Sequence, residues 1–374
     1  MSIQKSPLWP AAHDALILHA ALLQGDRAID AWHAWQQAVD QTRIDFAQLR
    51  LVPLLHHNLR RLGVRAENLA SFRNDTLVFW IRNQELFRFA CAEIESLSQL
   101  GVETLVLKGV PLANLYYPSP GLRPMSDVDL LVHPDQAVAA ISHCIERGWS
   151  CSDDFVVSLN NPEQLVAVRN GINMQDPASG RQIDLHWMLL KNSRADLASL
   201  WASSVHFDLC GQTLRTLCPS DQLFHACAQA ANWDVVRPIR WIPDASMIIR
   251  NTSVDWDRVV EQAQRTEMVS AIQDALGVLR AFLDLDVPQD AIARLGTCRV
   301  SVLSRIDYGS SARSPRALIG RPLLRIVRYL RIGRPQGLGF FQYLNYTWGT
   351  RSIFGALAYG LRLVWNDTFG HRNA

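Results

Sequence analysis

Residues 107–132 read LKGVPLANLYYPSPGLRPMSDVDLLV, and the end of this stretch marks where a buried strand begins. Asp127 and Asp129 start the apolar run DVDLLV, whose composition predicts a β-strand. Side chains at positions i and i+2 of a strand point to the same face, so the two carboxylates are expected to project together. Val128, between them, faces the opposite way, into apolar packing. The stretch therefore predicts a pair of acids on one face of a sheet.

The chain on either side of this strand predicts a small α/β core. VETLVLK (102–108) is short and bounded by glycines, which favours a strand, and VPLANLYY (110–117) favours a short helix. DQAVAAISHCIERG (135–148) has the spacing of an amphipathic helix. LVAVRNGINM (165–174) and RQIDLHWML (181–189) predict two strands, joined by the turn sequence QDPASG.

Helices are predicted on both sides of this core. Apolar residues recur at helical spacing from residue 11 to about residue 100, with Gly63 and Gly101 as helix terminators. Helical spacing resumes at Ser220, the expected N-cap, and includes a long periodic stretch at 261–283. The expected fold class is α+β, a small mixed-sheet core flanked by helical regions. The expected divisions are 1–100 (helical), 101–215 (α/β core), 216–295 (helical) and 296–374 (basic and mostly helical).

Composition indicates a globular protein with a large core, since 48% of the 374 residues are hydrophobic and 19% are charged. Seven cysteines occur without any C-x-x-C pair, which favours reduced thiols over a disulfide framework or a zinc site. The N-terminus lacks a signal-peptide pattern, and the apolar run at 353–365 is too short to span a bilayer and contains Arg362. These features predict a cytoplasmic protein without a transmembrane segment.

The charge of the chain is unevenly distributed. From Thr297 onward there are twelve arginines and two aspartates, a net charge of +10, which leaves −8 for the rest of a chain whose total is +2. Arg325, Arg328 and Arg331 recur every third residue, as in a basic amphipathic helix. A basic region of this kind indicates an acidic or polyanionic partner, peripheral contact with a membrane surface, or docking on the acidic body with a solvated arginine face.

Two like-charged carboxylates on one strand face repel each other, and a cation relieves that repulsion. Hard oxygen ligands suit Mg²⁺, which commonly bridges carboxylates to substrate phosphates. The alternative is a solvent-exposed strand start in which Asp127 caps a turn. IDLHW (183–187) adds a third acid, Asp184, on a strand that is able to lie beside the first. Three acids would complete a site for two metal ions or supply a general base.

Residues near the acids suggest phosphate contacts. Lys108 and Gly109 lie between a predicted strand and a predicted helix, where a glycine lets backbone N–H groups approach an anion. Arg123 and Ser126 directly precede the acids and are candidates for contacting a phosphate tail. The alternative is that Lys108 is exposed and Gly109 serves only the turn.

The order L-K-G, L…Y-Y-P, R-P-M-S-D-V-D-L-L-V and I-D-L-H-W resembles the uncharacterised nucleotidyltransferase family of bacteria. That family lies within the DNA polymerase beta-like nucleotidyltransferase superfamily. A helical block at 224–250 resembles later helices of the family, and the resemblance spans roughly residues 70–285. It implies that Asp127, Asp129 and Asp184 bind metal, and that Lys108-Gly109 corresponds to the usual Gly-Ser phosphate loop. Val110 stands where that loop has its serine.

The resemblance implies a Mg²⁺-dependent nucleotidyltransferase that moves a nucleoside monophosphate from a nucleoside triphosphate, expected to be ATP, to an acceptor. The acceptor is open: a small molecule, a peptide, a protein side chain or tRNA. The alternative is a non-catalytic nucleotide- or partner-binding protein that keeps the fold, which the missing serine favours. His186, His225, Arg240 and Asp244 are candidates for lining the nucleotide cleft, and structural hydrogen bonding or ion pairing explains them equally well.

Overall fold

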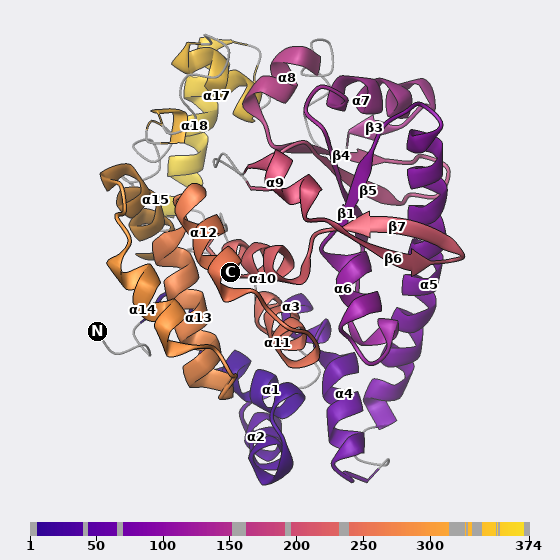
Figure 1. The fold of residues 1–374 in the computed structure, drawn as a ribbon, viewed down its shortest axis with the longest axis vertical. Coiled ribbons are helices and arrows are strands. Elements are labelled where there is room, and N and C mark those ends of the chain that lie inside the picture. Colours follow the sequence, from indigo (N-terminus) through magenta and orange to yellow (C-terminus); the bar gives the residue numbers. More distant parts are fainter. Residues whose placement is uncertain are drawn as a thin grey trace.

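The computed structural model confirms the predicted fold class, with a mixed sheet of seven strands and helices flanking it (Figure 1). The residues that it describes are 6–39, 44–65, 70–151, 162–190, 196–231, 239–313, 326, 328–330, 339–348, 350 and 352–369.

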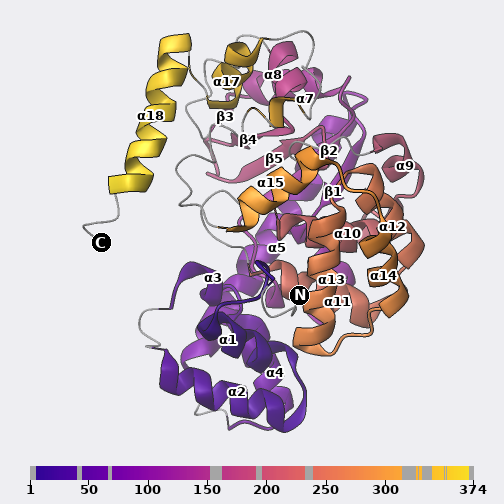
Figure 2. The same cartoon turned by 90° about the vertical axis from the view of Figure 1, so that its left-hand side faces the viewer.

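The predicted N-terminal helices are present. They are α1 (Ala12–Leu22), α2 (Gly25–Ala38), α3 (Phe46–Leu49), α4 (Val52–Arg61) and the long α5 (Ala70–Ser98). Gly63 and Gly101 follow α4 and α5 with φ of +83° and +74°, a backbone conformation that favours glycine, so both act as the predicted terminators. Helix α5 runs beside the sheet, whereas α1, α2 and α4 form the lower part of the molecule in Figure 2.

The sheet has the strand order β3-β4-β5-β2-β1-β7-β6. The strands are β1 (Thr104–Leu107), β2 (Asp127–Val132), β3 (Ser150–Cys151), β4 (Gly171–Gln175), β5 (Gln182–His186), β6 (Val205–Leu209) and β7 (Gln212–Thr216). Strand β2 pairs antiparallel with β1 and parallel with β5, so it lies at the centre of the sheet. Its apolar side chains are buried on both faces, which explains why the run VDLLV is apolar except at Asp129.

The two faces of β2 meet different helices. Val128, Leu130 and Val132 join a buried cluster with α5 and with α7 (Ala137–Glu146). Leu131, on the opposite face, joins the larger cluster formed by the N-terminal and C-terminal helices. Because Asp129 alternates with Val128 and Leu130, its side chain is directed toward the second set of helices. Short connections, α6 (Gly109–Leu115) and the 3₁₀ turn η4 (Pro120–Leu122), link β1 to β2.

Two predictions about the sheet need correction. The strand expected at 165–174 is a helix in its first half, α8 (Pro162–Val168), because Pro162 suits a first helical turn and Leu165 and Val168 bury one face; only β4 is extended. The hairpin β6–β7 and the short helix α9 (Leu197–Ala202) were not expected. Cys210 and Gly211 connect the hairpin with φ of +49° and +82°, as in a type I′ turn.

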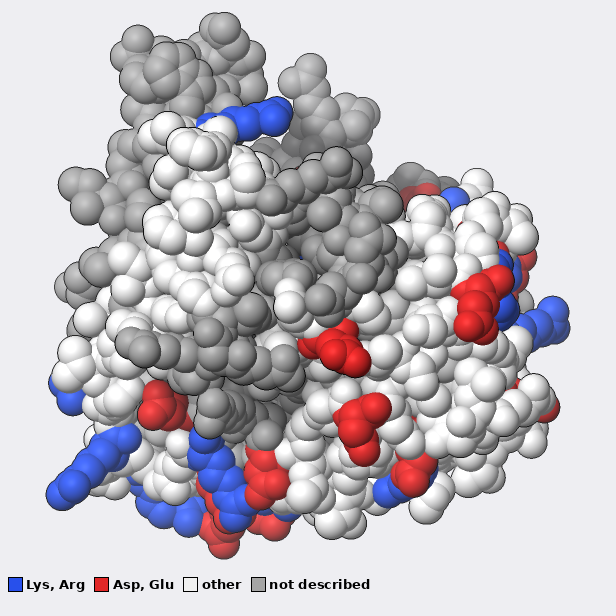
Figure 3. All heavy atoms as spheres, turned by 90° about the horizontal axis from the view of Figure 1, so that it is seen from above, with Lys and Arg blue, Asp and Glu red and all other residues white. Residues whose placement is uncertain are grey.

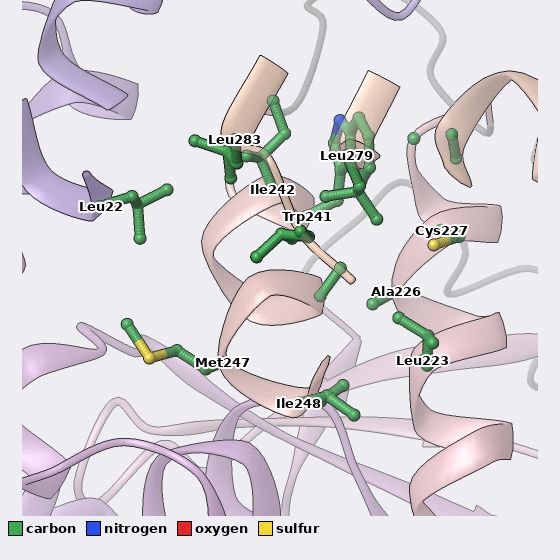
Figure 4. Close-up of a cluster of buried hydrophobic side chains, with 14 of the residues drawn as sticks. Leu22, Leu223, Ala226, Cys227, Trp241, Ile242, Met247, Ile248, Leu279 and Leu283 are labelled. Atoms are coloured by element: carbon green, nitrogen blue, oxygen red, sulfur yellow. The ribbon is translucent and has the colours of Figure 1, made fainter. Parts of the chain in front are cut away.

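The C-terminal helices pack around a common apolar centre. They are α10 (Pro219–Gln229), α11 (Trp241–Asn251), α12 (Trp256–Arg265), α13 (Val269–Leu283) and α14 (Gln289–Thr297). Figure 4 shows Trp241, Ile242 and Ile248 of α11 among side chains from α10 and α13. Burial of such side chains is worth about 2 kcal/mol each, so α11 is held firmly against its neighbours.

Two details of these helices differ from expectation. The N-cap of α10 is Cys218, and Ser220 lies inside the helix, where its Oγ accepts a hydrogen bond from the backbone N–H of Asp255 at 2.7 Å. Pro219 at the first helical position moves the start of the helix back. The periodic stretch 261–283 is divided between α12 and α13, because the chain turns at Glu267, which has a φ of +57°.

The basic region contributes α15 (Val302–Arg313), α17 (Phe340–Trp348) and α18 (Ile353–Phe369), with α18 standing to one side in Figure 2. Arg325 and Arg331 lie outside the described residues. Arg328 is 5% exposed and its Nε donates to Asp307 Oδ1 at 3.1 Å, so the expectation of a solvated arginine face is wrong for this residue. Acidic and basic side chains lie intermixed along the lower edge of the face in Figure 3. Among the described helices, none combines the length and apolar character that crossing a bilayer requires.

Candidate active site

The pairing of β2 with β5 brings two acids together. Asp129 and Asp184 are register partners on these parallel strands, so their side chains share one face of the sheet. His186 follows Asp184 by two residues and lies on the same face. One ligand atom from each of Asp129, Asp184 and His186 lies within 4.8 Å of the others. The prediction that the strand carrying Asp184 lies beside the strand carrying Asp129 is confirmed.

Asp129 is buried and makes two charge-assisted contacts. Its Oδ1 accepts hydrogen bonds from Lys108 Nζ and, at 3.1 Å, from His186 Nε2. Burial alone would raise the pKa of this carboxyl, but Lys108 and then His186 outweigh it and hold the pKa well below its usual range. Asp129 is therefore an anion at neutral pH. His186 Nδ1 is buried without a hydrogen-bond partner among the described residues.

Asp184 has a different electrostatic environment. Its Oδ1 accepts a hydrogen bond at 2.5 Å from Asn173 Nδ2, which lies opposite it on β4. Burial, followed by the negative charge of Asp129, raises the pKa of Asp184 above its usual value. Two neighbouring carboxyls with pKa values moved apart are suited to different tasks, a permanent anion and a proton acceptor.

Asp127 and Ser126 lie at the outer end of the site. Asp127 is half-buried at the start of β2 and its Oδ1 accepts a hydrogen bond from Ser126 Oγ at 3.3 Å. The same hydroxyl accepts a hydrogen bond from Arg50 Nη2 at 2.9 Å. Asp127 shares the strand face of Asp129 but stands outside the closest group of Asp129, Asp184 and His186.

The Lys-Gly turn connects β1 to α6. Lys108 has φ 50° and ψ −113°, the conformation of the first central residue of a type II′ turn, which normally requires glycine. Its side chain reaches across to Asp129. A Cβ on Gly109 would lie 2.6 Å from Met125 Sδ and 3.0 Å from Arg123 Nη1, so the site packs directly against this glycine.

Arg123 and Asp244 form a buried pair. Arg123 Nε and Nη2 donate to the two carboxylate oxygens of Asp244 at 2.7 and 2.8 Å, and Tyr117 Oη donates to Asp244 Oδ1 at 2.8 Å. This bidentate geometry fastens the loop before β2 to helix α11. The structure thus places Arg123 next to the predicted phosphate turn while two of its nitrogens are held by Asp244.

His225 lies on α10, facing the same cluster. It is 4% exposed, and burial, followed by the charge of Lys108, lowers its pKa to about 3, so it is neutral. Its Nε2 lies 3.0 Å from Gln229 Nε2.

Two residues of the site, Asn173 and Arg50, were not predicted from the sequence. The turn QDPASG carried a signal for Asn173, because the hairpin register that follows from it sets Asn173 opposite Asp184.

Comparison with known families gives one match. The model of a family described as "uncharacterised nucleotidyltransferase" matches residues 36–284, which is more than half of the chain. This range contains all the residues described above, from Arg50 to Asp244. No curated protein matches the chain.

Proposed function

The chain belongs to the uncharacterised nucleotidyltransferase family, and from this premise we propose that it is a Mg²⁺-dependent nucleotidyltransferase. It would move a nucleoside monophosphate from a nucleoside triphosphate, expected to be ATP, to an acceptor that is a small molecule, a peptide, a protein or tRNA. The observation that carries this proposal is the register of β2 and β5, which sets Asp129 beside Asp184, with Asp127 on the same face.

The donor set fits magnesium. Carboxylate oxygens are the protein ligands that Mg²⁺ prefers, and Asp127, Asp129 and Asp184 would hold it. When bound, the ion would neutralise charge that develops on the transferring phosphate. Lys108 supplies the positive charge that balances Asp129 in the structure described here, so ion binding would require Lys108 to share or leave that carboxylate.

Asp184 would receive the acceptor's proton. An acceptor hydroxyl oxygen would form a bond to the α-phosphorus as the bond from that phosphorus to the bridging oxygen breaks, and pyrophosphate would leave. The hydroxyl proton would pass to Asp184, whose raised pKa makes it the better base of the two facing acids. Released from Asp129, the Lys108 ammonium would be free to contact the departing phosphates.

A second function is favoured by two observations, the Lys108–Asp129 ion pair and the residue that follows Gly109. The Lys108 ammonium contacts the buried carboxylate of Asp129 at the position that a metal ion would occupy. Val110 also stands where the usual phosphate loop has its serine. A non-catalytic protein that retains the fold would show both features. It would bind a nucleotide or a partner without Mg²⁺ and would not transfer a nucleoside monophosphate.

Label transfer separates the two functions. The protein is incubated with Mg²⁺, cell extract as the source of acceptors, and each nucleoside triphosphate labelled at the α- or the γ-phosphorus. The enzyme moves the α-label into a product and releases the γ-label with pyrophosphate, and Asp129→Asn abolishes both. Nucleotide binding without any α-label transfer, from any of the four triphosphates, favours the non-catalytic protein.

A further inference from the structure

We infer that Arg50 and Arg240 form a phosphate-binding subsite at the outer end of the acidic cluster, next to Asp127. This subsite rests on the proposed function for the identity of its ligand, the terminal phosphates of a nucleoside triphosphate. Its two arginines come from outside the α/β core. Arg50 follows α3 in the N-terminal helices, and Arg240 is the N-cap residue of α11.

A narrow cavity brings these side chains together. Its wall contains the guanidinium-bearing residues Arg50, Arg123 and Arg240, one carboxylate, Asp244, and apolar side chains that include Leu54. Asp244 is committed to Arg123 through both of its oxygens. Within the ranges that the structure describes, neither Arg50 nor Arg240 has a carboxylate at ion-pair distance. The wall therefore carries two positive charges that no neighbouring acid pairs with.

Unpaired charge in a partly buried wall is costly, and an anion relieves that cost. Burial lowers the pKa of Arg50 to about 10, and the charge of Arg240 adds to this effect. Burial, followed by the charge of Arg123, also lowers the pKa of Arg240. Burial therefore destabilises the charged form of each guanidinium and the neighbouring guanidiniums add to this, whereas the charge of Asp127, and for Arg240 also that of Asp244, opposes it only in part. An anion between them would reverse the effect for both.

The position of the pair points to a phosphate that is near the reacting centre. Arg50 Nη2 donates to Ser126 Oγ at 2.9 Å, and Arg240 Nη1 donates to the Pro124 carbonyl at 3.3 Å. Both side chains therefore rest on the loop that runs directly into Asp127. A triphosphate whose α-phosphorus is at the acids would extend its terminal phosphates over this loop. Two planar guanidinium groups suit the bidentate recognition of phosphate oxygens.

The test is calorimetric binding of inorganic tripolyphosphate, ATP and AMP to the full chain, without and with Mg²⁺. Arg50→Gln and Arg240→Gln should each weaken binding of tripolyphosphate and ATP about tenfold or more, because each removes a charge-assisted contact, and should leave AMP binding unchanged. Arg60→Gln is the matched control, since Arg60 is an exposed arginine of α4, and it should bind as the wild type does. Arg50→Lys and Arg240→Lys keep the positive charge but lose the paired N–H donors of the guanidinium, so they should retain part of the affinity. These variants test the subsite if a glutamine variant fails to fold.

Equal tripolyphosphate affinity in wild type and folded arginine variants overturns the subsite. So does weaker binding of tripolyphosphate together with unchanged ATP affinity, because the pocket would then serve a phosphate on the acceptor. Failure of the proposed function looks different. Arginine-dependent tripolyphosphate binding without any transfer of α-label leaves the subsite standing and removes the enzymatic activity.

Discussion

At the scale of single residues, Asp184 is the side chain whose surroundings best suit proton transfer. We expect Asp184→Asn to lower turnover by about 10²- to 10⁴-fold, the usual contribution of a general base, while nucleotide affinity changes much less. Steady-state kinetics and calorimetry on the same preparation check this. Turnover within a fewfold of wild type would show that Asp184 is structural and that another base acts.

The buried position of His225 predicts how the stability of the protein depends on pH. The folded protein holds it neutral, with a pKa of about 3, whereas the unfolded chain protonates it near the ordinary value of 6.5. Between pH 3 and pH 6.5 the unfolded state binds a proton at His225 that the folded state does not bind. The contribution of His225 to the free energy of unfolding is therefore complete above pH 6.5 and is lost as the pH falls. Relative to His225→Gln, wild type should lose about 1.4 kcal/mol of unfolding free energy per pH unit from about pH 6 to about pH 4.

Urea denaturation across that pH range measures the difference between wild type and His225→Gln. His206→Gln, a change at an exposed histidine on β6, is the control and should follow wild type at every pH. Parallel stability curves for wild type and His225→Gln would contradict a neutral buried histidine.

Part of the site could be predicted residue by residue. The i, i+2 spacing was enough to put Asp127 and Asp129 on one strand face, and the motif IDLHW was enough to select Asp184 and His186. The contact of Lys108 with Asp129 could not be predicted, because it depends on the antiparallel register of β1 and β2, in which Leu107 lies opposite Asp129. Arg50 could not be found either, since it follows α3 and lies 76 residues before Ser126, which its side chain contacts.

At the scale of elements, the turn from β1 to α6 holds a lysine in a conformation that normally requires glycine. Such a conformation costs a non-glycine residue about 1–3 kcal/mol and is kept where function needs it. Lys108→Gly and Lys108→Ala both remove the charge, but only glycine removes the backbone strain. Lys108→Gly should therefore be about 1 kcal/mol more stable than Lys108→Ala in chemical denaturation. An alanine variant of equal or greater stability would mean that the turn is unstrained.

The strands differ in how far sequence could predict them. Strands β1 and β2 are apolar and nearly continuous, so they were expected from their composition alone. Strand β5 alternates between polar and buried apolar residues, and the strong turn sequence QDPASG before it made it predictable. Strand β6 lies at the edge of the sheet with β7 beside it, and both strands are short, with buried positions that alternate over only five residues each. Their turn has Cys210 at a positive φ, where Asn or Asp is usual, so the ordinary hairpin signal was missing.

At the scale of the whole molecule, the basic C-terminal region is at least partly docked on the body, since Tyr308 Oη donates to Asp274 Oδ2 at 2.6 Å and Val168 of α8 is buried with Tyr329 and Tyr343. Within this region Arg328 and Asp307 form a buried ion pair, and removing one partner of such a pair is strongly destabilising. Arg328→Gln should lower the free energy of unfolding by about 3 kcal/mol. Arg362→Gln, on an exposed position of α18, should change it by less than about 0.5 kcal/mol.

Equal stability of Arg328→Gln and Arg362→Gln would place Arg328 in solvent and restore it to a surface that recruits an acidic acceptor. The number of charges in the sequence could not distinguish a buried, paired arginine from an exposed one, because the sequence is the same in both cases. The boundaries of the four expected divisions of the chain stay a prediction.

The central claim, that three acids hold Mg²⁺ against a nucleotide, is tested most directly by calorimetry with Mg²⁺ and an ATP analogue that cannot be cleaved between its α- and β-phosphates. Wild type should bind the analogue with an affinity that depends on Mg²⁺, and Asp129→Asn should lose that dependence while its circular dichroism spectrum stays native. Asp135→Asn, at an exposed acid just beyond β2, should bind as wild type does. Unchanged Mg²⁺-dependent affinity in a folded Asp129→Asn variant would contradict the claim.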